Sequence, residues 1–360
     1  TVNDVSKVYN LFGKTVIMIL IQLGGIGIIT FSAIVVMMIS KKMGYFTKKL
    51  IQEDINANTT FEIQKFVKKV LITVFTIEII GAAILFLKFI QIFDYKKAIY
   101  YSIFHSISAF CNAGFALFTN NLSDFKDSVI INITIPLLIF LGGIGFATIL
   151  NIYQYFIKKD KRLNATTKIA IKISIFLIIL GTVLTFVLEY SNNRTLGTLP
   201  FWEKLGAAFF QSITTRTAGF NTVSIAELRE TTVFLFVVLM FIGASPGSTG
   251  GGIKTTTAGL ILLGIITTIK NKEYLEYNKR RISWKTYNKA MVIVFISIMY
   301  IVVILFLLIW LEKDTRVIEL GFELVSAFGT VGLSRDLTPK LTDISKLLIM
   351  ITMFVGRVGP

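Results

Sequence analysis

Long apolar stretches alternate with short polar ones along the whole chain. A helix needs about 20 apolar residues to cross about 30 Å of hydrocarbon. Three apolar stretches, near residues 98–110, 203–215 and 317–328, are too short for this and predict re-entrant half-helices. The longer stretches predict membrane-crossing helices near residues 14–40, 66–90, 128–157, 167–190, 231–269, 287–311 and 343–360. The pattern therefore predicts an all-α polytopic membrane protein.

The ends of the three half-helices match one another without a gap. The matching segments run from Phe104 to Phe115, from Phe209 to Phe220 and from Phe322 to Leu333, and each has a glycine at its second-last position. An apolar helix, a re-entrant segment and a second apolar helix, repeated along a chain, are typical of a pore with several filter-forming loops. We call these segments the filter segments.

A second glycine follows each filter glycine by 24 to 28 residues, in the next apolar helix. These landmark glycines are Gly142, Gly243 and Gly356. The stretch from Gln22 to Gly27 has the same pattern, so its own filter glycine is expected at or just before residue 1. We therefore expect four pseudo-symmetric helix–pore loop–helix repeats around one central pore, with the first filter missing and the last helix ending within the membrane. The expected units are residues 1–45 (second helix of repeat 1, partial), 65–160 (repeat 2), 165–270 (repeat 3, with a broken second helix) and 285–360 (repeat 4, partial).

Composition and charge support a membrane location. Hydrophobic residues make up 54% of the chain and charged residues only 16%, whereas about a quarter is charged in soluble domains. The net charge is +16, and lysine and arginine gather near residues 41–49, 158–172 and 270–289. All three connections lie on one side of the predicted membrane, which the positive-inside rule makes the cytoplasm, so the filter segments face outward from the plasma membrane. Topology thus explains the charge without a nucleic-acid partner.

A cation that loses its water needs replacement oxygens, and successive backbone carbonyls can supply them. Glycine reaches the required backbone conformations at low cost, which explains a glycine in every segment. The carbonyl ends of the half-helices also favour a cation through the helix dipole. The alternative is that these glycines only permit close helix contacts. The residues assigned to the carbonyl lining are Asn112, Ala113, Gly114, Thr217, Ala218, Gly219, Thr330, Val331 and Gly332.

The apolar run near residues 231–269 is about 40 residues long, roughly twice what one membrane helix needs. It must break, and one proline and four glycines between Pro246 and Gly252 mark the place. The stretch resembles a phosphate-binding loop, but Ile253 separates the last glycine from Lys254. We expect a loop beneath the filter that acts as a gate, the alternative being a simple kink. The expected gate residues are Ser245, Pro246, Gly247, Ser248, Thr249, Gly250, Gly251, Gly252, Lys254 and Arg357.

Four charged or titratable side chains lie where lipid would disfavour them. Arg357 is expected to face the cavity as an electrostatic barrier or to belong to a structural ion pair. Lys254 either lies in the ion path or reaches for water from a helix end. Glu78 is expected to have a structural hydrogen-bonding role, and His105 has no nearby second metal ligand. No nucleophile–base pair is present, so the chain is not expected to be an enzyme.

The stretches from Thr215 to Phe220, from Gly243 to Thr257 and from Gly356 to Pro360 closely resemble the Trk/Ktr/HKT superfamily of potassium transporters. The resemblance covers essentially the whole chain and is greatest to the bacterial Ktr/Trk membrane subunit, which translocates potassium. It implies K⁺ uptake through four non-identical pore loops, with K⁺ at the filter residues and no covalently bound cofactor. It also implies a homodimer in membrane lipid and a cytoplasmic ring of nucleotide-binding regulatory subunits.

Two alternatives to potassium uptake remain open. A sodium-selective or sodium-coupled member of the same superfamily is one, because the first filter lies outside the chain. The other is an alternating-access secondary transporter, in which broken helices are also common. Three filter segments that enter from the same side argue against inverted repeats and so against the second alternative.

Overall fold

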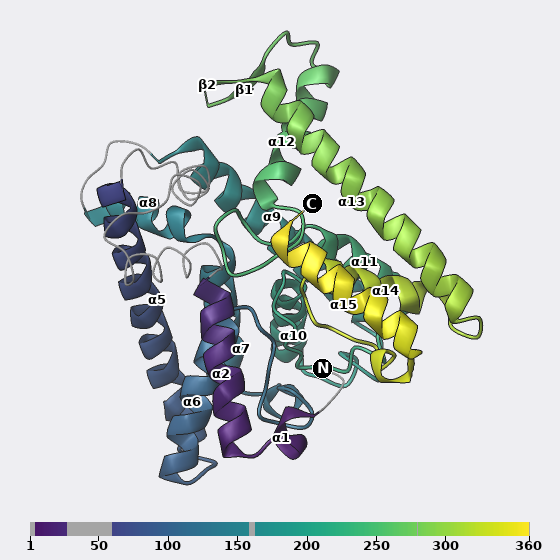
Figure 1. Ribbon diagram of the computed structural model, residues 1–360. Helices are drawn as coiled ribbons and strands as arrows, with labels where there is room; N and C mark the ends of the chain where they lie inside the picture. The colour runs from purple at the N-terminus through teal and green to yellow at the C-terminus, as the bar shows by residue number, and fades with distance from the viewer. Residues whose placement is uncertain (1–3, 27–59, 158–162, 279, 360) are drawn as a thin grey trace.

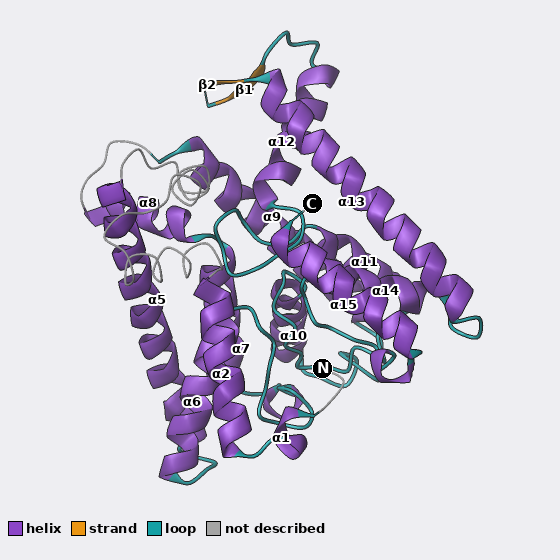
Figure 2. Cartoon of the chain, viewed as in Figure 1, coloured by secondary structure: helices purple, strands orange, loops and turns teal. Residues whose placement is uncertain are grey.

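The computed structural model describes residues 4–26, 60–157, 163–278 and 280–359. Within these residues, the regular elements are helices apart from one small antiparallel hairpin of β1 (Leu275–Tyr277) and β2 (Arg280–Ile282) (Figures 1 and 2). The chain therefore has the all-α architecture that its apolar pattern predicts.

Three described helices are long and apolar enough to cross a membrane: α5 (Thr60–Phe89), α9 (Ala165–Glu189) and α13 (Trp284–Leu311). Only 17% of the most apolar part of α13 is buried in the protein, and large side chains such as Phe295 and Phe306 are exposed. An apolar surface of this kind is stable against lipid but not against water. The chain is thus a multi-pass membrane protein.

Each long helix begins a unit of the same design. In every unit a half-helix follows the long helix, and a second apolar segment follows the half-helix. The first unit contains α5, α6 (Tyr95–Phe110), the short η1 (Ser123–Phe125), α7 (Val129–Gly143) and α8 (Phe146–Ile157). The second contains α9, α10 (Phe201–Thr214), α11 (Glu230–Phe241) and α12 (Thr255–Ile269), and the third contains α13, α14 (Val317–Phe328), η2 (Thr338–Lys340) and α15 (Asp343–Val358). The short α1 (Val5–Val8) and α2 (Leu11–Ile26) precede these units.

The half-helices α6, α10 and α14 pack in a regular order. Each contacts the long helix of its own unit, which is α5, α9 or α13 respectively. Each also contacts an earlier helix. α10 and α14 meet the helix that follows the half-helix of the preceding unit, which is α7 or α11 respectively, and α6 meets α2. In Figure 1, α10 accordingly lies in the middle of the molecule, between the first unit and the third.

Two of the landmark glycines permit a further close contact, between a half-helix and a later helix of the same unit. A side chain on Gly142 would collide with the carbonyl oxygen of Phe110, the last residue of α6. A side chain on Gly356 would collide in the same way with the carbonyl of Phe328, the last residue of α14. Both phenylalanines are completely buried. The glycines thus let a later helix pack directly on the end of a half-helix.

The prediction of a single helix near residues 128–157 is wrong. The structure has two helices, α7 and α8, whose axes differ by 99°. The chain turns at Gly145, whose φ of +95° suits glycine far better than other residues. The amide of Phe146 donates to the carbonyl of Gly247, at 2.8 Å, so a contact distant in sequence fixes the bend. Beyond Ile26, the helix expected near residues 14–40 lies outside the described residues.

Candidate ion pathway

The three filter segments share one backbone conformation. Each filter glycine has a positive φ: +70° at Gly114, +82° at Gly219 and +84° at Gly332. Two residues earlier, φ is positive again, although no glycine is present there. The values are +51° at Asn112, +72° at Thr217 and +53° at Thr330. In all three segments a residue without positive φ therefore lies between two residues with positive φ.

Positive φ is costly for threonine because its side chain branches at Cβ. Hydrogen bonds hold both threonines in this conformation. The hydroxyl of Thr330 accepts from the amide of Gly251 at 2.9 Å. The Thr217 hydroxyl bonds the side-chain amide of Asn112, in the neighbouring filter segment, across 3.0 Å. Strained backbone that its surroundings hold in place is typical of functional sites.

A hydroxyl at the end of each half-helix holds the residue that follows the filter glycine. Ser108 donates to the carbonyl of Phe115 at 2.8 Å, and Ser326 donates to that of Leu333 at 2.7 Å. In the second unit Thr214 donates to Phe220 at 2.6 Å. Thr214 lies six residues before its partner, whereas the two serines lie seven before theirs.

Between the half-helix hydroxyl and the residue after the filter glycine, the second unit therefore has one residue fewer than the other two units. A second pair of contacts agrees with this offset. Ser106 donates to the carbonyl of Glu78 in α5, and Ser212 donates to that of Ile178 in α9. Ser106 and Ser212 each lie two residues before the hydroxyl that holds the filter, so they occupy equivalent positions. The gap-free match therefore holds for the filter residues themselves and needs a one-residue gap within the second unit.

The filter segments converge on one another in chain order. A side chain on Gly114 would meet the carbonyl oxygen of Ala218 in the next segment. A side chain on Gly219 would meet the carbonyl oxygen of Val331 in the segment after that. At Gly332 no described atom lies within 4 Å of the equivalent position. Each of the first two glycines thus faces a backbone oxygen of the following segment.

One cavity of about 1060 Å³ connects the filter segments with Arg357. Six of the nine predicted filter residues line this cavity: Ala113, Gly114, Gly219, Thr330, Val331 and Gly332. Asn112, Thr217 and Ala218 are buried and do not line the cavity. The structure thus brings together, around one cavity, six predicted filter residues that are far apart in the chain.

The predicted loop is present where the long apolar run was expected to break. Residues 242–254 are non-helical between α11 and α12, and Gly247 and Gly252 have positive φ. The loop is closed on itself, because the amide of Ala244 donates to the carbonyl of Gly251 and the amide of Thr255 donates to that of Ala244, both at 3.2 Å.

The loop also bonds the two neighbouring units. Thr249 contacts the first unit, where its amide donates to Gly142 and its hydroxyl donates to Phe110, both across 3.2 Å. The amide of Gly252 contacts the third unit by donating to the carbonyl of Gly356 at 3.2 Å. Gly142 and Gly356, whose missing side chains admit the half-helix ends, therefore also supply acceptors for the loop.

Two predicted gate cations bond backbone carbonyls. Lys254 donates to the carbonyl of Gly250 at 3.0 Å, within the loop. One terminal nitrogen of Arg357 donates to the carbonyl of Thr249 and the other to that of Gly24 in α2, at 2.6 Å. Among the described residues Arg357 has no carboxylate within 4.0 Å. The ion-pair interpretation of Arg357 therefore finds no support in this part of the chain.

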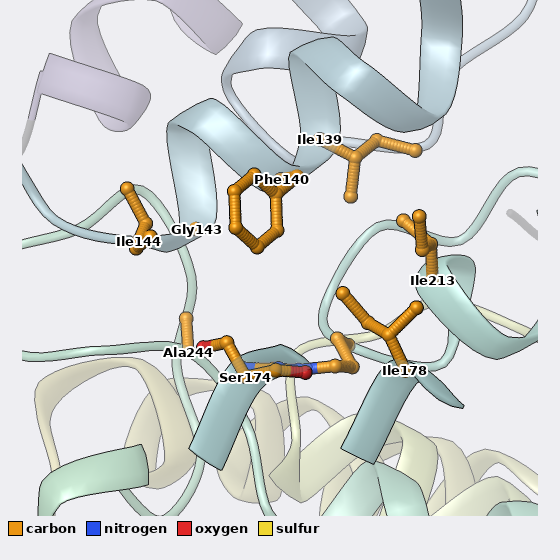
Figure 3. A pocket seen from close by; sticks show the side chains of 9 residues that line it. Ile139, Phe140, Gly143, Ile144, Ser174, Ile178, Ile213 and Ala244 are labelled. Atoms are coloured by element: carbon orange, nitrogen blue, oxygen red, sulfur yellow. The ribbon is translucent and has the colours of Figure 1, made fainter. Parts of the chain in front are cut away.

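Arg216 is a buried charge that the sequence analysis did not assign. It precedes Thr217, and its guanidinium donates to the carbonyls of Ser174 in α9 and Gly243 at the start of the loop, both at 3.1 Å. It lines a small cavity of about 10 Å³, room for about one water molecule, between α7, α9 and the loop. Figure 3 shows Ile139 and Phe140 on one side of this cavity and Ser174 and Ile178 on the other. Arg216 thus links a filter segment to the loop.

Glu78 and His105 lie in the first unit, away from the cavity that the filters line. Glu78 is buried and accepts a weak hydrogen bond from the thiol of Cys111 at 3.8 Å. His105 is completely buried, and its two ring nitrogens bond Tyr101 and Leu117. Both side chains thus bond groups of the first unit itself.

A family model described as "TrkH: Cation transport protein" matches residues 1–360. The chain is 37% identical to the Ktr system potassium uptake protein B of Bacillus subtilis, over 99% of this chain and 80% of that protein. It is 34% identical to the Vibrio alginolyticus protein of the same name, over 99% of this chain and 78% of that protein.

A potassium/sodium uptake protein, NtpJ of Enterococcus hirae, is 34% identical over the whole of this chain and 80% of its own length. The crystal structure of the potassium transporter TrkH from Vibrio parahaemolyticus has the same fold. Its TM-score is 0.74 at 18% identity, over 96% of this chain and 70% of that one.

Proposed function

Because this chain belongs to the TrkH family of cation transport proteins, we propose that it takes up potassium ions through a filter of backbone carbonyls. Relatives that are at least 34% identical over nearly the whole chain are named as potassium uptake proteins, and they are ion transporters rather than enzymes. K⁺ is then the transported substrate. The fourfold pore, the gate and the partners discussed below belong to the same proposal.

The observation that carries the proposal is the shared conformation of the three filter segments. Where residues with positive φ alternate with residues without it, successive carbonyls can turn to the same side of the chain, and such carbonyls can replace the water around a cation. The three segments line one cavity, and the first two glycines face the backbone of the next segment. A ring of segments around one axis explains both features.

The loop between α11 and α12 is the proposed gate. It bonds the helix ends of both neighbouring units, so it crosses beneath the filter rather than lying at the lipid surface. Non-helical backbone at this depth is stable because protein groups satisfy it. Arg357 holds the loop from below the filter and places a positive charge on the cavity wall, which opposes cation passage when the gate is closed.

A partner subunit is proposed on the side of the basic connections. The hairpin of β1 and β2 lies at the opposite end of the molecule from the connections that precede the half-helices (Figure 1). Arg280 and Arg281 are exposed there. Under the positive-inside rule this side is cytoplasmic, where a nucleotide-binding ring would meet the membrane protein. A homodimer in the plasma membrane completes the proposal.

Sodium is the second candidate ion, because one relative is a potassium/sodium uptake protein. The alternating-access mechanism has less support, since the three described units pack in the same order rather than as inverted copies.

The test uses cells that lack their own potassium uptake. Expression of the protein should restore growth at low external K⁺, and the purified protein in liposomes should admit K⁺ in preference to Na⁺. A Thr217→Pro variant, which cannot keep the positive φ of this residue, is the inactive control. Equal uptake of both ions would support the sodium-permeable alternative, and no uptake of either ion would refute the proposal.

A further inference from the structure

Each half-helix carries a buried polar side chain at the same place behind its filter. The residues are His105 in α6, Gln211 in α10 and Glu323 in α14, with exposed fractions of 0%, 0% and 4%. Each lies three residues before the hydroxyl that holds the end of the filter. The proposed transport function does not account for polar groups at this depth, where burial without a hydrogen bond is costly.

His105 fastens the chain beyond the first described filter. Its Nε2 accepts from the amide of Leu117 at 3.2 Å, and its Nδ1 bonds the carbonyl of Tyr101 at 2.7 Å. The amide can only donate and the carbonyl can only accept, so the imidazole is neutral with its hydrogen on Nδ1. The ring also stacks on Phe118, with 4.8 Å between ring centroids.

Glu323 makes the equivalent contact in the third unit. Its Oε1 accepts from the amide of Arg335 at 2.8 Å and from the hydroxyl of Ser334 at 2.7 Å, and its Oε2 accepts from Thr338. Leu117 and Arg335 occupy the same position, three residues after the filter glycine. A neutral imidazole and a carboxylate thus accept the same backbone hydrogen bond in two units.

Gln211 occupies this place in the second unit. The one-residue offset established by Ser106 and Ser212 aligns Gln211 with His105. Neither polar atom of its amide has a partner among the described residues, nor has the hydroxyl of Thr222, three residues after Gly219. Both residues are buried. The second unit therefore lacks the hydrogen bond that the other two units make at this place.

We propose that His105 and Glu323 are positioning residues of the ion filter. Each accepts, from behind, the amide three residues beyond the filter glycine, whereas Gln211 makes no such bond. The half-helix hydroxyl already holds the residue next to that glycine. Two attachments on a short segment fix the outer end of these two filters and hence the separation of their carbonyls, on which the preference for K⁺ over Na⁺ depends. This inference rests on the proposed function.

The test compares substitutions that remove the acceptor with substitutions that keep one. His105→Phe removes the acceptor nitrogen but retains an aromatic ring beside Phe118. Glu323→Leu removes the acceptor oxygens of the carboxylate. His105→Gln and Glu323→Gln keep an acceptor oxygen. Ser106→Ala is the matched control, because this neighbour in α6 bonds the long helix α5 and not the filter. The readout is the K⁺ concentration that half-saturates thermal stabilisation of the purified protein, measured alongside that for Na⁺.

The acceptor-free variants should raise the half-saturating K⁺ concentration about tenfold, equivalent to 1.4 kcal/mol, with little change for Na⁺. The glutamine variants should restore most of the K⁺ affinity, and Ser106→Ala should stay within about twofold of the unmodified protein, a change of less than 0.5 kcal/mol. Unchanged K⁺ affinity in both acceptor-free variants, or an equal loss in Ser106→Ala, would overturn the inference.

A second measurement needs no variant. In hydrogen exchange on the unmodified protein in K⁺, the amides of Leu117 and Arg335 should be protected as strongly as those within the half-helices. Rapid exchange at these amides would also overturn the inference. Failure of the unmodified protein to bind or transport K⁺ would instead refute the proposed function.

Discussion

Arg357→Ala tests the proposed gate most directly. Arg357 bonds two carbonyls that belong to different parts of the chain, Thr249 in the loop and Gly24 in α2. It lines the same cavity as the filter residues. Alanine removes both hydrogen bonds and the positive charge, so the loop loses an attachment that favours the closed position.

The size of the effect follows from these two bonds. A hydrogen bond that involves a charged group contributes about 1.5–3 kcal/mol to stability. Both carbonyls lie near a cavity that water can enter, so part of this free energy is recovered when the arginine is removed. A net loss of about 1.4 kcal/mol shifts the closed-to-open equilibrium tenfold. We therefore expect about a tenfold rise in K⁺ flux without the regulatory partner, as long as the open state is rare in the unmodified protein.

The assay is K⁺ flux into liposomes per folded molecule, with folded protein measured by size-exclusion chromatography. Arg357→Lys is the matched variant, because lysine keeps the charge but cannot bond two separated carbonyls at once. If Arg357 acts through its two hydrogen bonds, the flux of Arg357→Lys should lie between that of the unmodified protein and that of Arg357→Ala. If it acts only through its positive charge, the flux of Arg357→Lys should equal that of the unmodified protein. Flux per folded Arg357→Ala molecule at or below the unmodified value would refute the role in gating.

Three further predictions follow from the filter, the helix contacts and the basic connections. Gly219→Ser should lower the preference for K⁺ over Na⁺ in liposome uptake, because its positive φ and the nearby Val331 carbonyl both disfavour a side chain; unchanged selectivity would contradict the filter assignment. Gly356→Ala should sharply reduce the yield of folded protein by forcing apart α15 and the end of α14, whereas Gly321→Ala, with no atom within 4 Å of the new Cβ, should have a neutral or slightly favourable effect on the melting temperature. Purification from intact cell extract should recover a soluble partner, and nucleotide should change transport only in its presence; nucleotide sensitivity of the membrane protein alone would exclude this mode of regulation.

The sequence predicts features that depend on local composition. The half-helices and the membrane helices follow from the lengths of the apolar stretches. The break in the second unit follows from five helix-disfavouring residues between Pro246 and Gly252. These signals lie within the segments themselves, so no knowledge of distant contacts is needed.

Features that depend on tertiary contacts were missed. Residues near 128–157 are apolar throughout, and the bend at Gly145 becomes favourable only against the carbonyls of the distant loop. Thr217 and Thr330 normally avoid positive φ, and neighbouring segments hold them there. Arg216 would be too costly to bury without the carbonyls of Ser174 and Gly243, which come from other helices. Spacing in the sequence alone cannot reveal any of these partners.

The packing of the filter glycines has a rotational sense. Gly114 faces the backbone oxygen of Ala218, and Gly219 faces that of Val331, so each contact leads from one segment to the next in chain order. A side chain introduced at Gly114 would displace an oxygen of the second filter as well as distort the first. A side chain introduced at Gly219 would displace an oxygen of the third filter in the same way. Damage at either glycine should therefore pass to the following filter segment as well as to its own.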